Sequence, residues 1–61
     1  MDAIVYENKN YLVYKDEKNK CYTVYKRDLK PEVDSSYPLD VAGLNIAKAR
    51  VNYLVAPQYF N

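Results

Sequence analysis

Few side chains in this sequence could act as an acid, a base, a nucleophile or a metal ligand. The chain has 61 residues, no histidine, and one cysteine, Cys21. Histidine is the commonest general base, and a reactive thiol normally needs a cationic or basic neighbour. Cys21 lies within an apolar run, so we predict a buried, unreactive thiol. The adjacent carboxylates Asp16 and Glu17 fall in a polar turn, where they should point apart into solvent.

The missing residue types bear on cofactors as well. A structural zinc site needs about four nitrogen or sulfur ligands, which one cysteine without histidine cannot supply. Phosphate-binding loops use several glycines, and this chain has one. We therefore predict that the protein is not an enzyme and has no catalytic residues, no metal site and no cofactor.

The abundant tyrosines support a different chemistry, which is contact with another macromolecule. Eight tyrosines are present, and four of them fall in the two short runs 11–15 and 21–26. Both alternating positions of these runs are apolar or aromatic, so each strand has two water-averse sides. Two interpretations remain open: tyrosines that tolerate partial exposure, or a surface that another protein covers.

The segments that position these side chains follow from composition and turn signals. Three short runs rich in β-branched and aromatic residues are bounded by the polar clusters ENKN and DEKN. Connections this short join antiparallel neighbours, and Asn19 is expected to adopt the left-handed conformation in the second turn. We predict a single α+β domain over residues 1–61, a three-stranded antiparallel β-meander packed on one C-terminal α-helix (β-β-β-α). Its segments are strands at about 3–6, 11–15 and 21–26, a loop at 27–37, a helix at about 39–55 and a tail at 56–61.

The predicted helix has recognisable start and stop signals. Pro38 suits the first helical position, and Asp40 is either in the first turn or the cap itself. Gly43 costs about 1 kcal/mol relative to alanine inside a helix, so it should mark a close backbone approach. Pro57 should end the helix near Val55.

The helix has two apolar stripes instead of one. The first is expected to face the sheet and contains Val41, Leu44, Ala47, Val51, Leu54 and Val55. The second lies on roughly the opposite side and contains Ala42, Ile46, Ala49 and Tyr53. A helix that is apolar on two sides is normally buried on two sides, so we predict that the second stripe is an oligomer interface, most simply that of a homodimer.

The sheet presents the same excess of apolar surface. We assign to the core the face with the larger aliphatic residues, namely Ile4, Tyr6, Leu12, Tyr14, Tyr22 and Val24. The other face would contain Ala3, Val5, Tyr11, Val13, Cys21, Thr23 and Tyr25. We predict partner binding through Tyr11, Val13, Thr23, Tyr25 and Arg27 on that second face. A one-residue shift of register would exchange the two faces.

These patterns favour a non-enzymatic protein-binding module whose partner is another protein. Small phage or mobile-element inhibitors and adaptors that occupy a surface of a host protein have a comparable size and composition. The alternative is a module for single-stranded nucleic acid, in which Tyr11 and Tyr25 stack bases while lysines and Arg27 contact phosphates. The formal net charge of +1 argues against it.

The sequence also bears on location. The start MDAIVYENK lacks the basic and apolar regions of a signal peptide. No apolar run approaches the roughly 20 residues that cross a bilayer. A lone cysteine fits a reducing compartment, so we predict a cytoplasmic protein without membrane contact.

Overall fold

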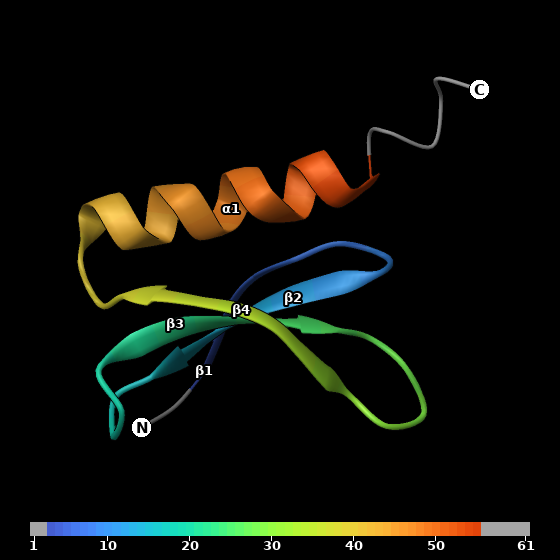
Figure 1. Ribbon diagram of the computed structural model, residues 1–61, viewed down its shortest axis with the longest axis horizontal. Helices are drawn as coiled ribbons and strands as arrows, with labels where there is room; N and C mark the ends of the chain where they lie inside the picture. The colour runs from blue at the N-terminus through green and yellow to red at the C-terminus, as the bar shows by residue number, and fades with distance from the viewer. Residues whose placement is uncertain (1–2, 56–61) are drawn as a thin grey trace.

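Residues 3–55, the part of the chain that the computed structural model describes, form one antiparallel sheet and one helix. The strands follow the chain in the order β1-β2-β3-β4, and α1 lies across one face of the sheet (Figure 1). The predicted α+β class with a C-terminal helix is confirmed, but the sheet has four strands instead of three. The elements are β1 (Ala3–Glu7), β2 (Tyr11–Asp16), β3 (Cys21–Lys26), β4 (Glu32–Pro38) and α1 (Val41–Val55). The predicted tail at 56–61 lies outside the described residues.

The fourth strand corrects the prediction of a loop at 27–37. β4 has the sequence EVDSSYP, and it pairs with β3 in a register that sets Tyr37 opposite Tyr22 and Ser35 opposite Val24. Serine, aspartate and proline disfavour strands in isolation, but strand preference depends strongly on the neighbouring strand and on edge position. Polar residues and a terminal proline are tolerated at the edge of a sheet.

Both outer strands carry an irregularity in their pairing. The register between β1 and β2 shifts between Ile4 and Tyr6, which leaves Val5 as an extra residue. The register between β3 and β4 shifts in the same way and leaves Asp34 as an extra residue in β4. Such bulges bend an edge strand and interrupt the regular row of its hydrogen-bonding groups.

The core lies between α1 and one face of the two central strands. Val13 of β2 and Val24 of β3 pair with each other and pack under Ala47 and Val51 of the helix, and all four side chains are inaccessible to solvent. The residues packed around this cluster are Tyr6, Tyr11, Tyr22, Tyr37 and Leu44. The core is thin, as expected for a chain of this length.

The first predicted stripe of the helix is confirmed in its middle and wrong at its start. Leu44, Ala47 and Val51 face the core, whereas Val41 is 77% exposed. The first turn approaches the preceding chain through Gly43 instead. A Cβ atom on Gly43 would overlap the carbonyl oxygen of Pro38, which confirms the predicted close backbone approach and explains why glycine occupies this helical position.

The start of α1 also resolves the role of Asp40. Its carboxylate accepts a hydrogen bond from the backbone N–H of Gly43 at 2.6 Å, and its carbonyl accepts one from Leu44 at 3.0 Å. Asp40 is therefore the N-cap. Pro38 ends β4 and does not start the helix, since two residues separate it from Val41.

The turn between β2 and β3 differs from the prediction in its left-handed residue. Lys20, with a φ of 57°, takes this conformation in place of Asn19. Asn19 instead donates hydrogen bonds from its backbone and its side chain to the two carboxylate oxygens of Asp16, at 3.0 and 2.7 Å. These hydrogen bonds from Asn19 lower the pKa of Asp16, and they use both of its oxygens to close the turn.

Candidate interaction surface

The strand register decides which side chains share a face of the sheet. Residues that pair across an antiparallel ladder point to the same side. Leu12 pairs with Tyr25 and Tyr14 pairs with Thr23, whereas Val13 pairs with Val24 on the side of α1. The predicted face assignment is therefore wrong, because it grouped Leu12 and Tyr14 with Val24. Within residues 3–55 no element covers the side away from α1. We call this side the open face; it comprises Ile4, Leu12, Tyr14, Cys21, Thr23, Tyr25 and Val33.

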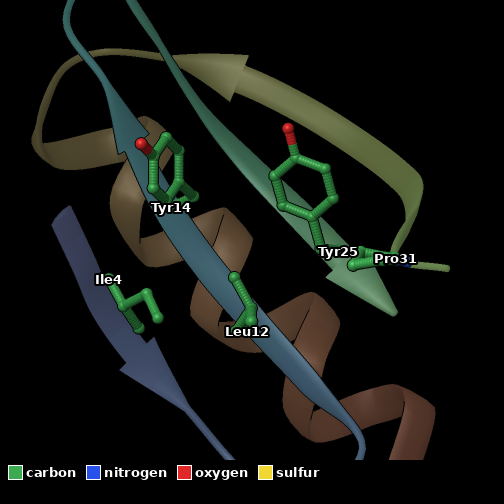
Figure 2. A pocket seen from close by; sticks show the side chains of 5 residues that line it. All are labelled: Ile4, Leu12, Tyr14, Tyr25 and Pro31. Carbon is green, nitrogen blue, oxygen red and sulfur yellow. The ribbon is translucent and has the colours of Figure 1, made fainter. Parts of the chain in front are cut away.

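A shallow apolar hollow lies on the open face. Its volume is about 370 Å³, and its lining comes from three strands and from the end of the β3–β4 loop (Figure 2). Two of its aromatic rings, those of Tyr14 and Tyr25, meet edge to face with centroids 6.1 Å apart and planes at 83°. The lining residues are Ile4, Leu12, Tyr14, Tyr25 and Pro31.

Exposure across the open face increases from its centre to its edges. Thr23 at the centre is buried, and its hydroxyl lies 3.5 Å from that of Ser36 and 3.4 Å from the sulfur of Cys21. At the edges Ile4 is 49% exposed and Val33 is 60% exposed. Cys21 is half-buried and not buried as predicted, and the lack of reactivity of its thiol stays a prediction. The centre of this face is therefore packed, while its apolar margin is available for contact.

The five residues predicted to bind a partner do not share one surface. Val13 is completely buried under α1, and Tyr11 packs against the same core. Thr23 is on the open face but buried. Tyr25 lines the hollow, and only Arg27 is exposed outright. The prediction that Val13 contacts a partner is therefore wrong, whereas partner contact through Tyr25 and Arg27 stays a prediction.

Arg27 lies at the margin of the open face, where an ion pair and hydrogen bonds fix its position. Its guanidinium forms an ion pair with Glu7, the residue opposite Leu12, and donates a hydrogen bond to the Asn8 carbonyl at 3.1 Å. Its backbone N–H also donates to the carbonyl of Asn10 at 2.8 Å. The polar margin beside the hollow is thus preorganised.

The predicted oligomer stripe lies on the outer side of the helix. Its four residues, Ala42, Ile46, Ala49 and Tyr53, are all exposed. Ile46 is 49% exposed, the same fraction as Ile4 on the open face. Self-association through this stripe stays a prediction.

An ion pair fastens the helix to the bulged edge strand. Arg50 donates two hydrogen bonds to the carboxylate of Asp34, at 2.8 and 3.1 Å. Asp34 also accepts a hydrogen bond from the Ser35 hydroxyl at 2.9 Å. The hydrogen bonds from Arg50 are the main reason that the pKa of Asp34 is lowered, and Asp34 in turn raises the pKa of Arg50. The side chains of Arg50 and Asp34 therefore connect α1 to β4.

Other kinds of site find no support in the part of the chain that the structure describes. Residues 3–55 contain no group of three histidine, cysteine, aspartate or glutamate side chains that could hold a metal ion. No helix within the same range is long and apolar enough to span a bilayer. No protein-family model, curated protein or solved structure matches the chain.

Proposed function

We propose that this chain is a non-enzymatic protein-binding module that docks through its open face. The observation that carries the proposal is the apolar hollow, which lies on a sheet face that no described element covers. Binding energy at protein interfaces concentrates where an apolar anchor of one partner fills a pocket of the other, surrounded by a polar rim. The paired charges of Glu7 and Arg27 provide part of such a rim.

The edges of the sheet are less suited to binding than its open face. A partner that adds a strand needs a regular row of free backbone groups. Val5 interrupts that row in β1 and Asp34 interrupts it in β4, and Pro38 has no N–H to donate at the end of β4. Docking of side chains into the hollow is therefore favoured over strand addition.

The alternative of single-stranded nucleic acid has less support. Tyr11 and Tyr25, the predicted stacking pair, are on opposite sides of the sheet. On the open face the charge of Arg27 is paired with Glu7, so it offers little free positive charge for phosphates.

Two isoleucines with the same exposed fraction provide the test. Ile4→Asp places a charge at the hollow, whereas Ile46→Asp places the same charge on the outer side of α1. The tagged protein and both variants are used to capture proteins from extracts of the producing cells, and bound proteins are identified by mass spectrometry. We expect Ile4→Asp to lose the partner that the unsubstituted protein and Ile46→Asp retain.

The opposite pattern would contradict the proposal. Loss with Ile46→Asp and retention with Ile4→Asp would move the contact to the outer stripe of the helix. Circular dichroism of each variant checks that the fold persists. Light scattering over a range of concentrations tests the proposed homodimer, which Ile46→Asp should dissociate.

A further inference from the structure

We propose that the segment of the partner that docks on the open face is uncharged: an apolar side chain fills the hollow, and the residues beside it are apolar or carry only hydroxyl or amide groups. This inference rests on the proposed function and specifies the chemistry of the partner. It is carried by the distribution of charged side chains over the two sides of the sheet and along its margins.

The strands carry most of their charged side chains on the side that α1 covers. The pairing of the strands places Lys15, Lys26 and Glu32 on that side. Asp34 reaches the same side, where it accepts hydrogen bonds from Arg50. An antiparallel sheet with one uncovered face normally has the reverse arrangement, with its polar residues on the uncovered face. The open face therefore has the composition of a surface that another molecule covers.

The charged strand residues on the open face lie at strand ends and have partners within the chain. Glu7 ends β1 and forms its ion pair with Arg27. Asp16 ends β2, and both of its carboxylate oxygens accept hydrogen bonds from Asn19. Between these ends the four described strands place no charged side chain on the open face. A charged group of a partner pressed onto this area would lose its water without gaining an opposite charge, which is unfavourable.

The loops that border the open face are balanced in charge. Segment 7–10 has one acidic and one basic residue, whereas segments 16–20 and 27–32 have two of each. Charge complementarity mainly sets the rate and the specificity of association. Neither end of the open face therefore has an excess of charge that would select an acidic or a basic segment, and recognition depends on apolar contact.

The lining of the hollow offers apolar surface and uncharged hydrogen-bonding groups. In Figure 2 the hydroxyl groups of Tyr14 and Tyr25 both point away from Leu12, and a phenolic hydroxyl can donate and accept hydrogen bonds without a charge. The volume of about 370 Å³ is near the lower end of ligand pockets, roughly 300–1,000 Å³. It suits one or two anchor side chains. The matching ligand is therefore a short segment with apolar residues at its centre and uncharged residues beside them, like the charge-depleted core of other interfaces.

Four capped hexapeptides test this chemistry: SSLFSS, EELFEE, KKLFKK and SSSSSS. Each is titrated into the ¹⁵N-labelled full chain at low salt, and backbone amide shifts are followed by NMR. We expect SSLFSS to shift the amides of Leu12, Tyr14 and Tyr25. It should bind about threefold or more tightly than either charged peptide, because charged flanks lose water at this face without compensation. SSSSSS, which lacks the anchor, should leave these amides in place.

The salt dependence of SSLFSS binding provides a second readout. Salt screens interactions between exposed charges but acts little on apolar contact. The affinity of SSLFSS should therefore change less than about twofold between about 0.02 M and about 0.5 M NaCl. A steep fall in affinity with added salt would contradict the uncharged partner.

A matched pair of variants exposes the charges that are now paired at the margin. Arg27→Gln leaves the carboxylate of Glu7 without its ion pair and should shift the preference toward KKLFKK by about threefold. Glu7→Gln leaves the guanidinium of Arg27 without its ion pair and should shift the preference toward EELFEE by a similar factor. The same spectra show whether each variant is folded. Unchanged preferences in both folded variants would overturn the role assigned to this neutralised margin.

The remaining outcomes separate this inference from the proposed function. If a charged peptide binds the open face as tightly as SSLFSS or more tightly, the uncharged partner is overturned and a protein-binding face stays in place. The absence of open-face shifts with all three anchored peptides would overturn the inference and count against the hollow as a docking site. Shifts of the same amides by a thymidine octanucleotide, without peptide binding, would assign the face to nucleic acid and overturn both.

Discussion

The two faces of the sheet are formed by the same strands but differ in the burial of their side chains. On the side of α1, Val13 and Val24 are completely buried and pack on small helical residues. On the open face, tyrosine and leucine side chains of the same strands surround a hollow, and Val33 is 60% exposed. The comparison shows that a single helix covers enough apolar surface to build the core. The second apolar face is therefore not needed for packing against the helix, which leaves it available for binding.

The sharpest test of this difference compares two valines on adjacent strands. Val24→Ala removes buried methyl groups from the covered face and should lower the free energy of unfolding by about 2–3 kcal/mol. Val33→Ala on the open face should cost less than about 1 kcal/mol, since most of that side chain already meets solvent. Urea unfolding of both variants, followed by circular dichroism, measures the two values. Equal losses would show that both faces contribute alike to stability.

The next largest effect is expected where α1 leaves β4. Alanine usually stabilises a helix by about 1 kcal/mol relative to glycine. Gly43→Ala should do the reverse and destabilise the protein by about 2 kcal/mol, because the added Cβ would overlap the Pro38 carbonyl and lift the helix from the covered face. Asn45→Ala is the control: it lies exposed in the same helix and should add about 0.5 kcal/mol. Thermal unfolding compares the two, and a stabilised Gly43→Ala variant would show that the helix can shift freely.

The smallest effect concerns the ion pair that joins the helix to β4. The pKa of Asp34 is lowered in the folded state, chiefly by the hydrogen bonds from Arg50. The contribution of the Asp34 carboxylate to the free energy of unfolding is therefore present above the unfolded pKa of Asp, about 3.9. It is lost as the pH falls through the lower pKa of the folded state. Because Arg50 is partly exposed, we expect Asp34→Asn to cost at most about 1 kcal/mol at pH 7.

The pH dependence provides the readout for this variant. Between about pH 5 and pH 2 the stability of Asp34→Asn should fall less steeply than that of the unsubstituted protein. Asp16 also has a lowered pKa, so some acid dependence should remain until Asp16→Asn is added. Urea midpoints at each pH test this, and parallel curves for the protein and Asp34→Asn would rule out the contribution of the ion pair.

The helix could be predicted from the sequence because its signals are local. The apolar spacing of Leu44, Ala47 and Val51, the capping residue Asp40 and the unusual position of Gly43 each indicate a feature that the structure contains. β4 could not be predicted in this way. Its polar residues form a strand because β3 provides a partner, and that partner lies outside the local sequence.

The face assignment failed because it did not take the length of the turn between β2 and β3 into account. Asp16 pairs with Cys21 across a turn of four residues. The two residue numbers of every β2–β3 pair therefore add to an odd number. Even positions of β2 therefore share a face with odd positions of β3, as Leu12 does with Tyr25. The sequence prediction grouped positions of equal parity and so mixed the covered face with the open one. Counting the turn would have joined Tyr14 to Tyr25 and brought the lining of the hollow together.

The bulges of the outer strands have a consequence for the protein at high concentration. A small tyrosine-rich sheet with a net charge of +1 has little electrostatic repulsion to keep copies apart, and unbroken edge strands would let it grow into stacked fibrils. The extra residues Val5 and Asp34 break the regular template at both ends of the sheet. Pairing of two copies through their edge strands is therefore less favourable than it would be with regular edges.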